Sequence, residues 1–142
     1  MGDSTHGDRS TTTVGVRVPA RPDQLIMLRS LAETVSLIAD FALDEVTDIR
    51  LALDEIATAL VLDAAPDTEI DCRFTYDRTH MRVRADAVSA SATVSARADL
   101  SRHIVQTLTE SFDVSQAAFD PRTGGYPTVV EFDWCRPTAG SR

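Results

Sequence analysis

Lysine is absent from this chain. Its 142 residues hold 14 basic side chains, and all of them are arginine. Schiff-base chemistry and the phosphate-binding loop of P-loop nucleotide-binding proteins both need a lysine amine. The sequence therefore excludes both mechanisms.

Glycine is also scarce. The chain has six glycines, and none lies between Gly15 and Gly124. Glycine allows backbone amides to approach a phosphate closely and to adopt a positive φ. The long stretch between these two residues therefore contains no glycine-rich phosphate loop.

Cysteine and histidine are too few and too scattered to build a metal site. The two cysteines are Cys72 and Cys135, and the histidines are His6, His80 and His103. Their spacing matches neither a disulfide framework nor a zinc site, so we expect two reduced thiols and no metal bound by protein ligands alone. Cys72 alternates with apolar neighbours, which predicts that it faces the core.

Long apolar runs are missing as well. No run approaches the ~20 residues that span a bilayer. The polar segment 1–13 lacks the apolar core of a signal peptide, so we expect a cytoplasmic protein without a membrane association. The formal net charge of −8 disfavours nucleic-acid binding, because that affinity comes from neutralised phosphates. Such a charge would attract a basic protein partner, although it could also serve solubility alone.

The pattern of apolar residues predicts one domain over residues 13–136, between a disordered tail at 1–12 and a loose tail at 137–142. Alternating residues predict strands, and apolar residues at helical spacing predict helices. The expected strands are 14–18, 70–76, 81–85, 114–119 and 128–134. The expected helices are 23–41, 44–63 and 99–112, and residues 87–98 are either a mobile loop or a weak helix.

This order of elements predicts a two-layer α/β sandwich, in which helices and strands form separate layers as in α+β folds. Strands with one apolar and one polar face need helices on one side only. We therefore expect a mixed β-sheet that is covered on one face by about three helices.

The segment 44–61 carries the most information about function. Its apolar side chains recur at helical spacing, which predicts a helix with one buried stripe. Glu55 lies off that stripe, and Ala59 follows it one turn later. Glu55 could also be an ordinary solvated helix residue. The members of the expected stripe are Val46, Ile49, Leu53, Ile56 and Leu60.

The order of elements and residues 29–58 resemble the anti-sigma-factor kinases of the RsbW type, which have the histidine-kinase-like ATPase fold. The resemblance covers roughly residues 14–134. It implies that Glu55 matches a general base that orients the serine hydroxyl of a partner protein. Ala59 stands where the family has a magnesium-binding asparagine, and alanine offers no oxygen to a metal.

The resemblance also identifies residues for the rest of an ATP site. Asp86 matches the aspartate that holds the adenine amino group, and Thr128 matches a threonine that supports it. The two glycine-rich boxes of the family are absent here, since the first reads Ala85-Asp86-Ala87-Val88-Ser89-Ala90 and the second Ala98-Asp99-Leu100-Ser101-Arg102. Loss of a metal ligand and of the amide cradle removes charge stabilisation, usually the largest catalytic contribution. ATP and magnesium are therefore not firmly implied as cofactors.

The resemblance further implies protein partners. Family members bind a sigma factor and keep it from RNA polymerase, they are released by an antagonist protein, they act in stress responses, and they form homodimers. Arg29 matches an arginine of the first helix that contacts the sigma factor. Our first hypothesis is an anti-sigma factor with weak or lost kinase activity, and the alternative is an active ATP-dependent serine-protein kinase that phosphorylates the antagonist. An adaptor with a partner other than a sigma factor is a third interpretation.

Overall fold

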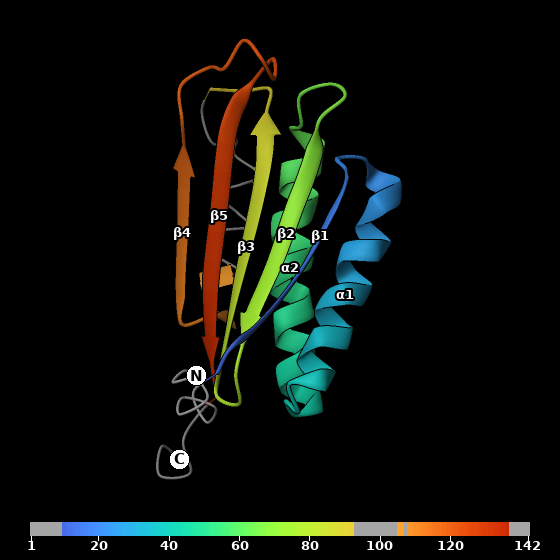
Figure 1. Ribbon diagram of the computed structural model, residues 1–142, viewed down its shortest axis with the longest axis vertical. Helices are drawn as coiled ribbons and strands as arrows, with labels where there is room; N and C mark the ends of the chain where they lie inside the picture. The colour runs from blue at the N-terminus through green and yellow to red at the C-terminus, as the bar shows by residue number, and fades with distance from the viewer. Residues whose placement is uncertain (1–9, 93–104, 107, 137–142) are drawn as a thin grey trace, which may run out of the picture.

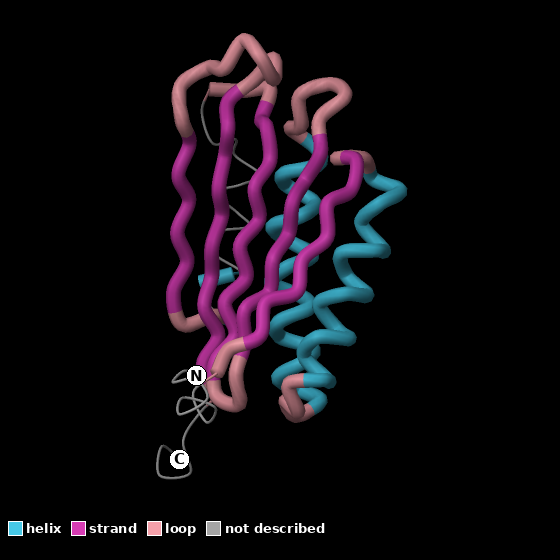
Figure 2. Tube along the Cα trace, viewed as in Figure 1, coloured by secondary structure: helices cyan, strands magenta, loops and turns pink. Residues whose placement is uncertain are grey.

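The chain folds into two layers, a five-stranded sheet and a pair of helices that covers one of its faces (Figures 1 and 2). The computed structural model describes residues 10–92, 105–106 and 108–136. The predicted two-layer α+β architecture is confirmed. The strands are β1 (Thr12–Pro19), β2 (Glu69–Tyr76), β3 (His80–Ser89), β4 (Ser111–Gln116) and β5 (Tyr126–Cys135), in the spatial order β1-β2-β3-β5-β4.

Every pair of neighbouring strands in the described sheet is antiparallel, so the expectation of a mixed sheet is wrong. The reason lies in the connection between β1 and β2. It contains two antiparallel helices, which return the chain to the end of the sheet where β1 finished. A single crossover helix would have carried the chain to the opposite end and produced a parallel pair.

The helices begin and end close to the predicted residues. A short 3₁₀ turn at Pro22–Gln24 precedes α1 (Leu25–Ile38), and α2 spans Leu43–Leu62. Asp40 between them has a φ of 66°, a left-handed conformation that reverses the chain. The carboxylate of Glu45 then accepts a hydrogen bond of 2.7 Å from the backbone N–H of Ala42 and so satisfies a free donor at the start of α2.

Half of the third predicted helix, 99–112, and half of the segment 87–98 lie outside the described residues, as do most of the predicted tail 1–12 and all of the predicted tail 137–142. Helical residues occur at positions 105, 106 and 108. The predicted end of this helix is wrong, because Phe112 lies in β4 and pairs with Phe132 of β5. The expectation of a loop or weak helix is also wrong at the start of 87–98, because β3 continues to Ser89.

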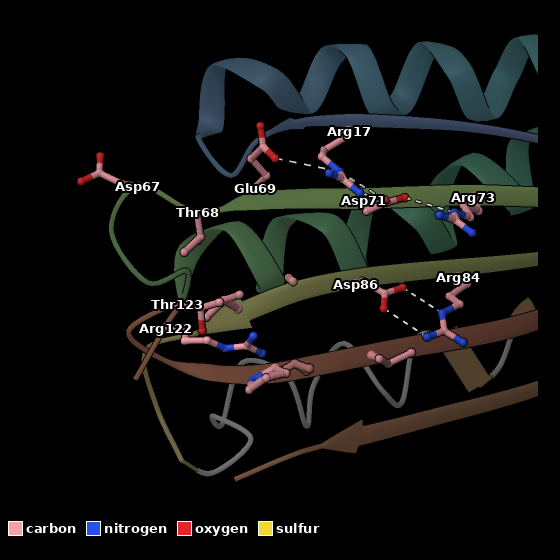
Figure 3. Close-up of a pocket in the computed structure, with 15 residues that line it drawn as sticks. Arg17, Asp67, Thr68, Glu69, Asp71, Arg73, Arg84, Asp86, Arg122 and Thr123 are labelled. Carbon is pink, nitrogen blue, oxygen red and sulfur yellow. Dashed lines mark hydrogen bonds and ion pairs between the residues drawn. The ribbon is translucent and has the colours of Figure 1, made fainter. Parts of the chain in front are cut away.

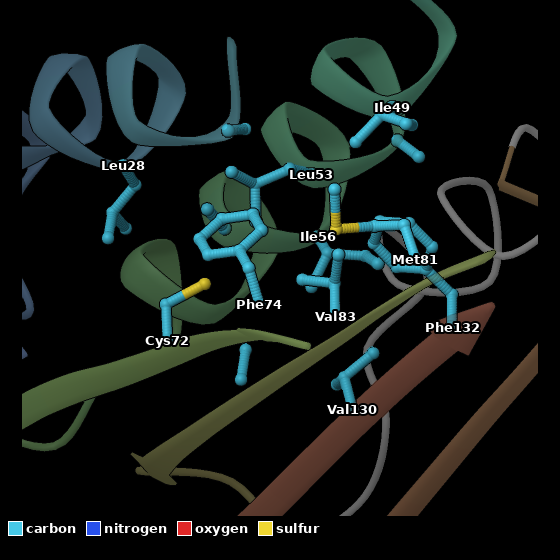
Figure 4. Packing of buried hydrophobic residues seen from close by; sticks show 14 of the residues in the cluster. Leu28, Ile49, Leu53, Ile56, Cys72, Phe74, Met81, Val83, Val130 and Phe132 are labelled. Carbon is cyan, nitrogen blue, oxygen red and sulfur yellow. The ribbon is translucent and has the colours of Figure 1, made fainter. Parts of the chain in front are cut away.

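One apolar core lies between the two layers. All five residues of the predicted α2 stripe are buried, and they pack against the sheet (Figure 4). Cys72 is fully buried, as predicted, and this burial raises the pKa of its thiol to about 12. Both cysteines are free thiols. The sheet residues at the centre of this core are Phe74, Met81, Val83, Val130 and Phe132.

The other face of the sheet is polar and carries rows of paired charges. At one end of this face Asp133 of β5 is the common acceptor for three side chains from two neighbouring strands. It receives hydrogen bonds from His80 (2.8 Å) and Arg82 (2.9 Å) of β3 and from Ser111 (2.7 Å) of β4. These bonds fasten the edge strand β4 to one side of β5 and strand β3 to its other side. No described helix is both long and apolar enough to cross a membrane.

We predict that Leu53→Ala lowers the free energy of unfolding by about 2–5 kcal/mol, because it leaves a cavity in the core. Leu53 is 1% exposed, whereas Leu51 on the same helix is 42% exposed. Leu51→Ala is the matched control and should cost much less, because little apolar surface is buried there. Urea denaturation of both variants measures the difference, and equal costs would contradict this packing.

Asp133 also gives the stability of the fold a defined pH dependence. Burial by itself raises the pKa of this carboxyl, but the hydrogen bonds from Arg82 and Ser111 and the nearby positive charges outweigh burial and lower it. A lowered folded-state pKa stabilises the fold above the unfolded value of about 3.9, and this contribution disappears as pH falls through the folded-state pKa. We expect the stability difference between the natural protein and Asp133→Asn to shrink as pH falls from about 5 to about 2 in urea denaturation. A constant difference would contradict the assignment.

Candidate functional site

Glu55 and Ala59 lie one turn apart on the side of α2 next to its buried stripe, and both are half-buried. The helix forms here because Leu53, Ile56 and Leu60 lie on the core side. The methyl group of Ala59 provides no oxygen ligand on this surface of α2. Among the described residues, no group of three or more histidine, cysteine, aspartate or glutamate side chains could hold a metal ion.

Asp86 lies on the other side of the sheet from α2. Its neighbours in β3, Ala85 and Ala87, are buried under the helices, so the alternation of the strand turns Asp86 to the polar face. There its carboxylate accepts hydrogen bonds from Arg84 at 2.8 and 3.1 Å (Figure 3). A ligand between α2 and the sheet would therefore not reach Asp86 from the side of Glu55.

Thr128 lies on the helix-covered face, in a small buried cluster of polar groups. Its hydroxyl donates to the carbonyl oxygen of Tyr126 (2.9 Å) and accepts from the side-chain amide of Gln116 (3.0 Å). The hydroxyl of Ser89 lies 2.8 Å away, and it must donate because the Thr128 proton is already in use. One donor and two lone pairs are thus all occupied, and the Thr128 hydroxyl is saturated.

The cluster extends to the end of α2. Gln116 also donates to the carbonyl oxygen of Ser91 (3.1 Å), and the Ser91 hydroxyl donates to Asp63 (2.8 Å). Gly125 allows β5 to start close to β3, since a Cβ atom there would lie 2.5 Å from the carbonyl oxygen of Ser89. Sequence reasoning missed Ser89 and Gln116. The signal for Ser89 was available, because continuing the alternation of β3 places it on the buried face.

Asp86 and Thr128 both border an open basin of about 870 Å³ at this end of the sheet, but their side chains point to opposite faces. Three arginines that line the basin already bind carboxylates. Arg17 and Arg73 lie 3.1 and 3.4 Å from Asp71, and Arg84 binds Asp86. The charges of the basin therefore compensate one another, and the basin is not an evident anion site.

The described residues do not fit magnesium-bound ATP. The segment at the position of the first glycine box belongs to the extended strand β3. This strand pairs with β2 as far as Asp86 and with β5 as far as Ser89. Backbone N–H groups in a strand point alternately to its two edges and do not converge on a phosphate. Ala59 lacks a ligand atom, and the Thr128 hydroxyl has no hydrogen-bonding capacity left.

Arg29 lies on α1 and is bound to α2 rather than free. Its guanidinium donates to one carboxylate oxygen of Asp54 from Nε (3.1 Å) and from Nη2 (2.8 Å). The two side chains are 37% and 34% exposed, so a partner can still reach both.

Comparison with known proteins finds similarity over most of the chain. No protein-family model matches the chain. Two curated proteins, the anti-sigma-F factors RsbW of Mycobacterium tuberculosis strains CDC 1551 / Oshkosh and ATCC 25618 / H37Rv, are each 28% identical over 117 residues. The matched region covers 82% of this chain and 70% of each relative. The resemblance that the sequence predicts is thus confirmed, and the chain is RsbW-like over most of its length.

Proposed function

We propose that this chain is an anti-sigma factor, which binds a sigma factor of RNA polymerase and keeps it from the polymerase. The observation that carries this proposal is the similarity to proteins named anti-sigma-F factor over 82% of the chain. Sequestering a partner requires a stable surface and no chemical step. Residues 13–136 act as one binding domain, and an antagonist protein releases the sigma factor by competing for it in the cytoplasm.

The proposed activity does not depend on kinase chemistry. Transfer of a phosphoryl group needs a metal and donors that stabilise developing charge. Ala59 supplies no ligand, and Asp86 binds Arg84 on the polar face. Glu55 is in this proposal a vestigial general base, and the Thr128 cluster has a structural role. Control of the antagonist therefore comes from outside this protein.

Arg29 is the residue that we propose for the sigma-factor contact. Arginine presents a planar fork of donors to carboxylates, and buried arginines are frequent hot spots of protein interfaces. The side chain is accessible on the outer surface of the helical layer. Ile26, one turn before it on α1, is an exposed apolar residue, which suits a protein surface better than a small charged ligand. We propose that the binding unit is a homodimer.

The first test is recovery of the partner. Tagged full-length protein should co-purify a sigma factor from the source cells, and the two purified proteins should then bind in isothermal titration calorimetry. We expect Arg29→Ala to weaken this binding by about 10–100-fold, the effect of losing an interface hot spot. Arg17→Ala is the matched control, because Arg17 makes a similar pair with Asp71 on the polar face of the sheet. Absence of any sigma factor from the recovered proteins would refute the proposed function.

The second test concerns nucleotide. We expect no heat of binding when magnesium-bound ATP is titrated into the protein, and no labelled phosphate on co-purified proteins after incubation with γ-labelled ATP. Glu55→Gln should leave the affinity for the sigma factor unchanged, because Glu55 would act only in phosphoryl transfer. Phosphoserine on an antagonist, present with the natural protein and lost with Glu55→Gln, would instead establish the kinase.

A further inference from the structure

The outer surface of the α1–α2 pair contains two ion pairs that join the helices side by side. Arg29 of α1 binds Asp54 of α2, and Arg50 of α2 faces Glu33 of α1. Arg29 and Glu33 are one turn apart on α1, as are Arg50 and Asp54 on α2, so the two pairs are neighbours. We call these four residues the helix seam.

The two pairs differ in how well they use their donors. Arg29 places Nε and Nη2 at 3.1 and 2.8 Å from the same oxygen of Asp54, which is a well-formed charge-assisted contact. Arg50 Nε lies 3.7 Å from the carboxylate of Glu33. That nitrogen is buried and has no hydrogen-bond acceptor among the described residues. The seam therefore holds one guanidinium with two donors bound to Asp54 and one with an unused buried donor.

Large apolar side chains flank the seam. Ile26 precedes Arg29 by one turn of α1 and is 65% exposed, and Leu51 precedes Asp54 by one turn of α2 and is 42% exposed. At the far end of the seam Leu37 and Leu43 are 51% and 76% exposed. The two arginines, each paired with a carboxylate and surrounded by apolar groups, suit a protein surface that presents a carboxylate between apolar side chains.

We propose that Asp54 is an internal competitor for Arg29, which holds the guanidinium until a carboxylate of the protein partner takes its place. This inference rests on the proposed sigma-factor binding and specifies how the binding surface is controlled. Asp54 keeps Arg29 extended along the seam in the free protein. Its negative charge also repels the incoming carboxylate, so the affinity is lower than the contacts alone would provide.

In this proposal, removing the charge of Asp54 strengthens the binding of the partner, whereas removing a side chain that contacts the partner weakens it. Asparagine has nearly the same shape as aspartate but no charge, so Asp54→Asn removes both the competition and the repulsion. Two carboxylates that compete for the same guanidinium lower each other's affinity for it, whereas a side chain that contacts the partner raises the affinity of the complex. Binding should therefore become tighter when Asp54 is neutralised, and this gain should depend on Arg29.

The test is a double-mutant cycle with the sigma factor recovered by co-purification. We expect Asp54→Asn to tighten binding by about threefold to tenfold, as for an accessible ion pair that no longer has to be broken. Arg29→Gln should weaken binding, and in the Arg29→Gln background Asp54→Asn should give a clearly smaller gain, because only the repulsion is left to remove. Thermal unfolding of each variant verifies that it is folded.

Asp71→Asn is the matched control, because Asp71 also binds an arginine through Nε and Nη2, on the polar face of the sheet. It makes the same change in net charge and should leave the affinity unchanged. An unchanged or weaker affinity of Asp54→Asn would overturn the proposal, as would an equal gain with Asp71→Asn. If no sigma factor binds the natural protein, the proposed function itself fails, which is distinct from normal binding that ignores Asp54.

Discussion

The packing of the α2 stripe against one face of the sheet is the constraint on which the other features depend. Because Ile49, Leu53 and Ile56 are buried there, the rotation of α2 about its axis is fixed. This rotation turns Asp54 toward α1 and sets Glu55 beside the core. The same packing makes the other face of the sheet the polar one, since a strand has only two faces. Burial of the α2 stripe thus determines which charged side chains can contact one another.

Much of the fold could be predicted from the sequence, because long periodic segments determine their own type. Helices α1 and α2 and strand β2 are close to their expected bounds, and the hairpin β2–β3 was predicted although β3 runs four residues further than expected. The direction of the strands was not predictable in the same way, since it depends on how the helix pair returns the chain. The start of β4 at Ser111 was missed for another reason. Phe112 fits a helical stripe and a strand equally well, and its pairing with Phe132 decides between them.

The candidate site was harder to predict than the fold. A motif assigns Asp86 by its position in the sequence, but the orientation of its side chain depends on where β3 ends. Residues 87–98 were expected to be a mobile loop or a weak helix, and β3 instead continues to Ser89, which gives Asp86 a partner on the polar face. Arg29 had a predicted role, but its partner Asp54 lies 25 positions away and only the contact of two helices reveals it. Such pairs are tertiary information that periodicity does not contain.

The saturated hydroxyl of Thr128 limits how this scaffold could be re-engineered. Restoring a metal ligand at Ala59 would not by itself make an ATP receptor, because Ser89 and Gln116 would still block the hydroxyl to a purine. Both blocking groups would have to be removed at once, and each removal leaves a buried polar atom unpaired at a cost of about 1–3 kcal/mol. A variant with only one of the two groups removed is thus less stable and still binds no nucleotide. Stepwise selection for nucleotide affinity would therefore first lower the stability of the fold.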